Sequence, residues 1–92
     1  MRLSMDEIVN AVCLNVAERR QIRPTDVTVE LLWDEELGFS AEVTVQGRSW
    51  YLVEGNLIEA ILRYLGTEYG IRTFPDRVRL ELTDEIVAEV AE

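Results

Sequence analysis

The sequence predicts an α+β domain of two layers, in which an antiparallel sheet carries two helices packed on one face. Three observations lead to it. Residues 26–53 alternate apolar and polar side chains with a period of two, as half-buried strands do. Amphipathic segments that begin with capping boxes lie on both sides of that stretch. A second alternating stretch follows near the C-terminus. The expected order is α-β-β-β-α-β-β, in a single domain of residues 1–92.

The first two predicted strands form a hairpin around Gly38, which can adopt a positive φ. Pairing Trp33 with Phe39 places Glu30 directly opposite Glu42 on the polar side. The buried side is then expected to carry the apolar set Val27, Val29, Leu31, Trp33, Phe39, Ala41, Val43 and Val45.

The third predicted strand follows a tight turn at residues 46–49. With Gly47-Arg48 as the two-residue tip, Val45 faces Trp50, Val43 faces Leu52, and Glu42 has Val53 beyond it. Tyr51 and Val53 then join the polar side. A slip of one residue would exchange Trp50 for Tyr51 on the buried side.

The first helix is predicted to begin after Ser4, the N-cap of a capping box with Glu7, and to end near Gln21 before Arg23-Pro24. Leu14 falls nearly opposite its apolar stripe and is interpreted as exposed, with a partner contact as the alternative. The stripe consists of Met5, Ile8, Val9, Val12, Cys13 and Val16.

The second helix is predicted to begin at Asn56, in a capping box with Glu59, and to end at Tyr69 before Gly70. Glu59 and Arg63 are expected to form an exposed ion pair four residues apart. The buried face should carry Ile58, Ile61, Leu62, Leu65 and Tyr69.

The C-terminal region has one clear strand at residues 78–82 and one ambiguous segment at 86–91. The composition of 86–91 also suits a short helix. An internal echo favours a strand instead: Val27-Thr-Val-Glu-Leu and a later Ala-Glu-Val recur as Val78-Arg-Leu-Glu-Leu and a later Ala-Glu-Val. In a strand, Ile86, Ala88 and Val90 would face the core.

Composition excludes several classes of protein. The 92 residues carry a net charge of −9, and all nine basic residues are scattered arginines, so we expect neither nucleic-acid nor membrane binding. There is no histidine, the commonest general base and metal ligand. One cysteine and an N-terminus without an apolar leader predict a cytoplasmic protein.

Three stretches, LSMDEIVNAVCLNVAERR, VELLWDEELGFSAEV and NLIEAILRYL, resemble the YxcD-like family of short acidic proteins from spore-forming bacteria. The similarity covers essentially the whole chain. Its shared features are caps, core positions and loop residues, none of them specific to a chemistry. The resemblance implies a cytoplasmic bacterial protein and implies no activity.

Two features could carry chemistry, and each has a simpler interpretation. Cys13 lies in an apolar helical stripe with no histidine to activate it, so core packing is favoured over a reactive or redox role. Asp34, Glu35 and Glu36 form an acidic loop without calcium-loop spacing. A solvated turn is therefore favoured over a cation site.

The pair Glu30 and Glu42 is the sharper observation, because like charges directly opposite each other destabilise a sheet. Solvation or an arginine, with Arg79 the candidate, is the favoured compensation; a cation or a basic partner surface is the alternative, and a catalytic dyad is the least favoured. Leu32, Tyr51 and Val53 make the same side partly apolar.

We therefore expect a non-enzymatic protein-interaction module or homodimer that uses the outer side of the sheet or an edge strand. The alternative is a protein that binds a small molecule or a divalent cation through the sheet-face carboxylates. No catalytic residue, resident metal or cofactor is expected. The expected interaction face consists of Glu30, Leu32, Glu42, Tyr51 and Val53.

Overall fold

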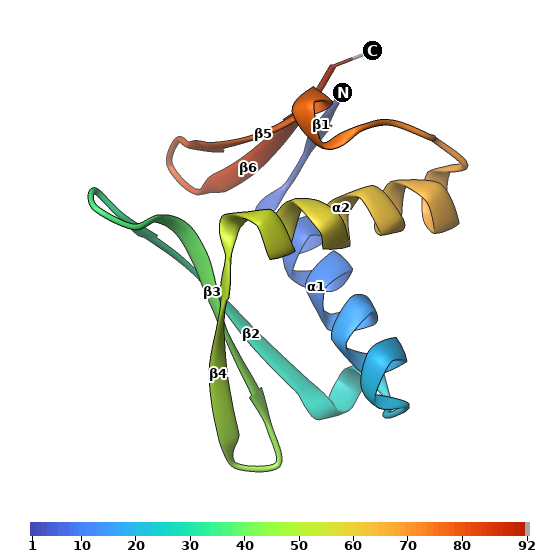
Figure 1. Ribbon diagram of the computed structural model, residues 1–92, viewed down its shortest axis with the longest axis vertical. Coiled ribbons are helices and arrows are strands. Elements are labelled where there is room, and N and C mark those ends of the chain that lie inside the picture. The colour runs from blue at the N-terminus through green and yellow to red at the C-terminus, as the bar shows by residue number, and fades with distance from the viewer. Residues whose placement is uncertain (92) are drawn as a thin grey trace.

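The computed structural model describes residues 1–91 and contains two helices and two three-stranded antiparallel sheets (Figure 1). The predicted α+β class and order of elements are confirmed, including a strand rather than a helix at the C-terminus. The elements are β1 (Arg2–Leu3), α1 (Met5–Arg20), the 3₁₀ turn η1 (Pro24–Asp26), β2 (Val27–Asp34), β3 (Gly38–Val45), β4 (Arg48–Val53), α2 (Glu54–Tyr69), the 3₁₀ turn η2 (Pro75–Arg77), β5 (Val78–Leu82) and β6 (Ile86–Val90).

The strands divide between two sheets, where the sequence predicted one. The first sheet has the order β2-β3-β4 and the second the order β1-β6-β5. Strand β1 was not predicted, because two residues are too few to show an alternation. It nevertheless pairs Arg2 with Glu89 and Leu3 with Ala88, and Leu3 is fully buried.

The two halves of the chain have the same architecture, β1-α1-η1-β2-β3 followed by β4-α2-η2-β5-β6. The sequence echo is part of this repeat, since a proline opens the 3₁₀ turn before β2 and before β5. The first strand of each half is exchanged: β1 pairs with β6 of the second half, and β4 pairs with β3 of the first. The two halves are therefore interlocked.

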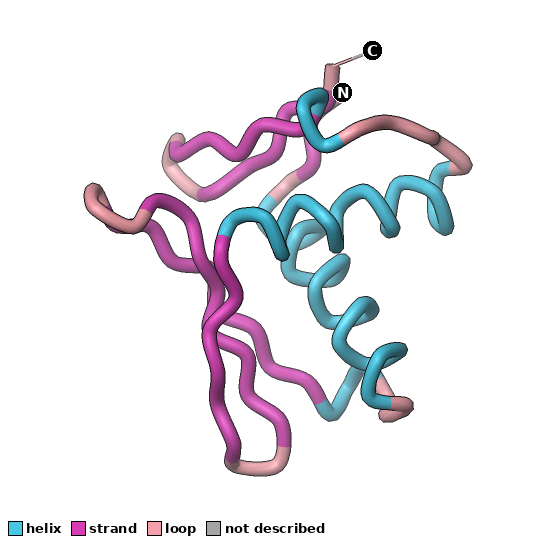
Figure 2. Tube along the Cα trace, viewed as in Figure 1, coloured by secondary structure: helices cyan, strands magenta, loops and turns pink. Residues whose placement is uncertain are grey.

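The helices share the repeat. The buried positions 8, 11, 12 and 16 of α1 have the same spacing as the buried positions 57, 60, 61 and 65 of α2. Helix α1 packs against β2 and β6, and α2 packs against β3, β4 and β5. The helices also pack against each other, so that a single core lies between them and the two sheets (Figure 2).

The buried arc of α1 is wider than the predicted stripe. Ser4 caps the helix as predicted, in a capping box with Glu7. Ala11 and Ala17 are buried as well, because α1 also packs against α2. Leu14 is half-buried and packs on the core, which corrects its assignment as an exposed residue.

Helix α2 begins earlier than predicted. Its N-cap is Val53, whose N–H donates to Oδ1 of Asn56 at 3.1 Å, so Asn56 caps the helix from its first turn. Gly70 ends the helix with a φ of 66°, as predicted. Tyr69 is 46% exposed and does not belong to the buried face, where Leu57 lies instead.

The predicted ion pair between Glu59 and Arg63 is wrong. Both side chains reach across to the neighbouring helix, where Glu59 pairs with Arg19 and Arg63 pairs with Glu18. The predicted pair lies four residues apart on one helix, whereas the observed pairs bridge α1 and α2. Exposed pairs of this kind contribute little to stability.

The register of the first hairpin is confirmed, with Trp33 opposite Phe39 and Glu30 opposite Glu42. That of the second hairpin differs from the prediction. Gln46 and Gly47 form its tip with φ values of 50° and 79°, the combination of a type I′ turn. Val45 therefore faces Arg48, Val43 faces Trp50, and Ala41 faces Leu52.

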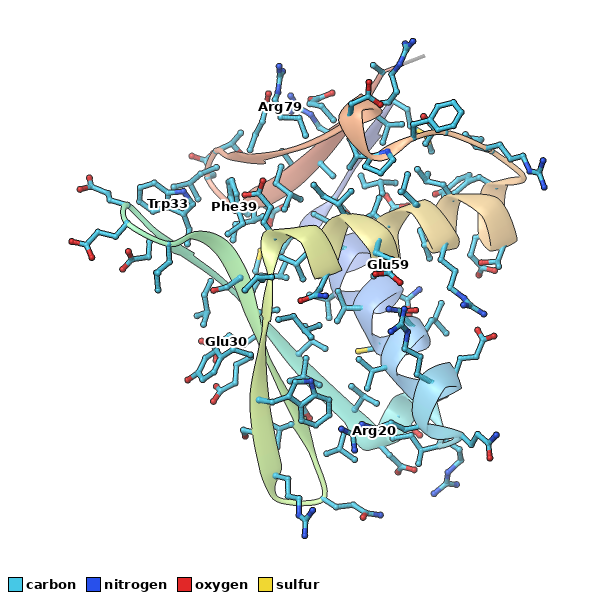
Figure 3. All side chains as sticks on the ribbon, in the orientation of Figure 1. Arg20, Glu30, Trp33, Phe39, Glu59 and Arg79 are labelled. Atoms are coloured by element: carbon cyan, nitrogen blue, oxygen red, sulfur yellow. The ribbon has the colours of Figure 1, made fainter. Side chains whose placement is uncertain are left out.

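This shift of two residues leaves Trp50 and Leu52 on the predicted side of the sheet, because side chains alternate with a period of two. At the other end of this sheet, Trp33 is 43% exposed and was wrongly expected to be buried. The reason is its place beside the turn at the tip of the hairpin, beyond the reach of the helices (Figure 3).

Substitution of Gly47 in the turn and of Gly66 in helix α2 by alanine should have opposite effects on stability. Gly47→Ala should lower the free energy of unfolding by about 1–2 kcal/mol, because alanine is strained at a positive φ. Gly66→Ala, in the exposed interior of α2, should raise it by about 0.5–1 kcal/mol through helix propensity. Urea unfolding of both variants measures the difference, and equal effects would contradict the turn assignment.

Candidate functional site

The side of the β2-β3-β4 sheet that faces away from the helices is the candidate site (Figure 1). The register places nine side chains on it in three rows across the strands. We call them the outer face: Thr28, Thr44 and Ser49; Glu30, Glu42 and Tyr51; Leu32, Ser40 and Val53. All five side chains predicted for the interaction face belong to this set.

The middle row of the outer face carries two carboxylates and a phenol. Glu30 lies directly opposite Glu42, and Figure 3 shows Glu30 on the side of the sheet away from the helices. Tyr51 rather than Val53 lies beyond Glu42, because of the shift in register. The hydroxyl of Tyr51 donates to Oε2 of Glu42 at 3.4 Å, a long and exposed hydrogen bond.

Arg79 does not compensate the two glutamates. It lies on β5 in the other sheet (Figure 3), where its Nε donates to Oε1 of Glu81 at 2.8 Å. The predicted role of Arg79 was wrong because the prediction assumed one continuous sheet. Within residues 1–91, neither Glu30 nor Glu42 forms an ion pair, so a positive charge from outside the chain could compensate them.

The apolar part of the outer face lies next to these carboxylates. Tyr51 and Val53, neighbours on the edge strand β4, are both 65% exposed. Leu32, in the same row as Val53, is half-buried. An aromatic ring and a branched apolar side chain at the edge of a sheet are typical of protein contact surfaces.

All charged side chains of the β2–β3 hairpin, which carries most of the outer face, are acidic. Between Arg23 and Arg48 the chain contains no basic residue. Asp34 organises the β2–β3 turn, because its Oδ1 accepts the N–H groups of Glu36 at 2.7 Å and of Leu37 at 3.2 Å. This agrees with the interpretation of the acidic loop as a solvated turn. Within residues 1–91, no three histidine, cysteine or acidic side chains are grouped to hold a metal ion.

Cys13 is half-buried on α1 and approaches the core. Its Sγ donates to the carbonyl oxygen of Val27 at 3.7 Å. Burial raises the pKa of the Cys13 thiol above its usual range, because the thiolate is poorly solvated there. Both observations favour a packing role over the reactive one.

A concave surface lies on the inner side of the same sheet, and sequence patterns did not indicate it. It is a hollow of about 280 Å³ between α1, β4 and α2. Trp50 and Leu52 form its floor, and Arg20 and Glu59 lie on its walls. The only signal in the sequence was the position of Trp50 on the inner side of β4, which also suits an ordinary core residue.

None of the helices within residues 1–91 is both long enough and apolar enough to span a bilayer.

The facing glutamates predict a stabilising substitution. Glu30→Gln should raise the free energy of unfolding by about 0.2–0.5 kcal/mol, because it removes the repulsion from Glu42. Glu35→Gln, in the turn, is the matched control with no opposing strand residue and should change stability less. Urea unfolding tests both. A loss of about 1 kcal/mol for Glu30→Gln would show that a bound group compensates the pair.

The raised pKa of Cys13 predicts slow alkylation. At pH 8 the native thiol holds a smaller fraction of thiolate than an unfolded chain does, so iodoacetamide should react with it more slowly. The reaction is followed by mass spectrometry on native and urea-unfolded protein. A native rate equal to the unfolded rate would mean that the thiol is accessible and unshifted.

Comparison with known proteins gives the same family as the sequence resemblance. Residues 1–85 match the family described as "Protein of unknown function (DUF2653)". The uncharacterized protein YxcD of Bacillus subtilis (strain 168) is 31% identical over 81 residues, which cover 87% of this chain and 78% of the relative. No solved structure matches. The chain therefore belongs to the DUF2653 family.

Proposed function

We propose that this protein is a non-enzymatic interaction domain of the cytoplasm, whose outer face binds a basic surface of another protein. The observation that carries the proposal is the exposure of Tyr51 and Val53 beside the facing carboxylates of Glu30 and Glu42. The single unpaired cysteine suits a reducing compartment.

The negative charge of the outer face favours a basic partner. Glu30 and Glu42 repel each other, and Asp34, Glu35 and Glu36 lie at the end of the same hairpin. An arginine or lysine placed over the outer face would remove the repulsion and gain the attraction of both carboxylates. The phenol of Tyr51 adds a flat surface on which a guanidinium can stack.

A second copy of the chain fits this face less well. A dimer with twofold symmetry brings the same patch of each protomer together. It would place the carboxylates of the outer face near their own copies, in an assembly of two chains that each carry a charge of −9. A basic partner has no such cost, so we favour it over the homodimer.

Neither acid–base catalysis nor cation binding is favoured by the outer face. Its carboxylates lie on an open sheet surface, without the enclosure that shifts a pKa toward the range of acid–base catalysis. A divalent cation held by Glu30 and Glu42 would need further oxygen ligands from water. Calorimetric titration with Ca²⁺ and Mg²⁺ tests this alternative, since the interaction domain predicts no saturable heat.

The double substitution Tyr51→Glu with Val53→Ser should weaken partner binding by about tenfold or more, because it removes the exposed apolar contacts and adds a repelling charge. Phe74→Ser is the control, as Phe74 is 71% exposed and lies on the loop between α2 and η2, outside the outer face. Tagged protein captures partners from lysate of its host, and calorimetry with each purified partner gives affinities at low and high salt.

The partner is expected to carry a basic surface and to bind less tightly as salt rises. Unchanged affinity in the double variant would contradict the use of the outer face. A partner without basic residues would contradict the charge argument. Sedimentation of the chain alone as a dimer that the double variant dissociates would show that a second copy occupies the face.

A further inference from the structure

The hollow on the inner side of the β2-β3-β4 sheet marks a difference between the two halves of the chain. The repeat makes Leu52 of β4 equivalent to Leu3 of β1, because each directly precedes the N-cap of its helix and faces the alanine of an Ala-Glu-Val segment, Ala41 or Ala88. Leu3 is fully buried, whereas Leu52 is only half-buried. The repeat therefore provides an internal comparison for the hollow.

In the second half of the chain, the end of α2 is held against the first turn of α1. Tyr69, in the last turn of α2, donates its hydroxyl to Oε2 of Glu7 at 2.5 Å. Its ring meets that of the buried Tyr64 edge-to-face, with centroids 5.9 Å apart. An aromatic side chain thus ties the end of α2 to the beginning of α1.

In the first half, an arginine takes the corresponding place. Arg20, in the last turn of α1, extends toward β4 (Figure 3), and its guanidinium carbon lies 4.2 Å from the ring centroid of Trp50. Below it the hollow of about 280 Å³ remains open, with Val16 as an apolar wall. Tyr69 thus holds the end of α2 against α1, whereas the end of α1 leaves a hollow beside β4.

The polar groups around the hollow carry both signs of charge. Arg20 makes no ion pair with any residue of the described chain, 1–91. Arg19 and Glu59 pair with each other on the wall. Oδ1 of Asn15 is buried without a hydrogen-bond partner, and a buried acceptor left unpaired costs free energy.

We propose that this hollow binds a free α-amino acid with a branched apolar side chain, of the size of valine or leucine. Its carboxylate would pair with Arg20, and its ammonium group would donate to Asn15 Oδ1 and to Glu59. Its side chain would cover the exposed parts of Trp50 and Leu52. One small molecule would thereby give Asn15 Oδ1 a donor, give Arg20 a counter-charge and cover the apolar floor of the hollow.

The size of the hollow limits the ligand. A volume of about 280 Å³ lies just below the range of roughly 300–1,000 Å³ that is typical of ligand pockets, so it suits a very small molecule and excludes nucleotides and larger cofactors. One arginine outside an ion pair suits a single carboxylate better than a phosphate. The apolar floor disfavours amino acids with charged side chains, because they would lose their hydration.

Trp50 is also the natural reporter for the test. The variant Trp33→Phe leaves Trp50 as the only indole, and Trp33 is exposed enough to be replaced. Titration of this variant with L-leucine should give a saturable change in fluorescence. Glycine should bind more weakly because it lacks the apolar side chain, and 3-methylbutanoate because it lacks the ammonium group.

In the same background, Arg20→Gln and Asn15→Ala should each weaken leucine binding by about tenfold, the effect expected for loss of a hydrogen bond to a charged group. Arg23→Gln is the matched control, because Arg23 is exposed, pairs with Asp26 and does not line the hollow. Circular dichroism establishes that each variant is folded. The double variant of the outer face should bind leucine normally, so the two proposals fail independently.

Three results would overturn the assignment. The first is no saturable response to leucine or valine up to about 10 mM, a concentration that corresponds to a binding free energy weaker than about 3 kcal/mol. The second is equal loss of binding in Arg20→Gln and Arg23→Gln. The third is equal affinity for leucine and 3-methylbutanoate, which would show that the ammonium group finds no partner.

Discussion

The exchange of first strands between the two halves is the constraint on which the rest of the structure depends. Strand β1 finds its partner in β6, and β4 finds its partner in β3, so neither sheet is complete without a strand from the other half. The helices pack against both sheets and bury Ala11 and Ala60 at equivalent positions. Close packing of two such helices is possible because these two side chains are small.

A repeated architecture makes the differences between the halves informative. Core positions are similar in both halves because each helix packs against a sheet and against the other helix. Surface positions are under no such constraint and can differ. The hairpin of the first half is longer, and all its charged side chains are acidic. The last residue of α1 is Arg20, whereas the last residue of α2 is Tyr69. Both surfaces proposed here for binding, the outer face and the hollow, belong to the β2-β3-β4 sheet. In the second half, Tyr69 instead joins the end of α2 to Glu7 of α1.

Local patterns in the sequence predicted the elements well, because alternation, capping boxes and glycines act over a few residues. The pairing of Glu30 with Glu42 followed from the hairpin around Gly38 alone. Features that depend on distant contacts could not be predicted in this way: the two-residue strand β1, the division into two sheets, and the place of Arg79. The hollow was missed for the same reason, since three separate elements form its walls.

Strand exchange also affects the order in which the chain can fold during synthesis. The sheet β2-β3-β4 is contiguous in sequence and can pair as soon as residue 53 has left the ribosome. By contrast, Arg2 contacts Glu89 across 87 residues, so the first strand made must wait for the last. Until then Leu3 and the inner faces of both helices have no complete cover. The nascent chain therefore exposes apolar surface until its last strand has been made.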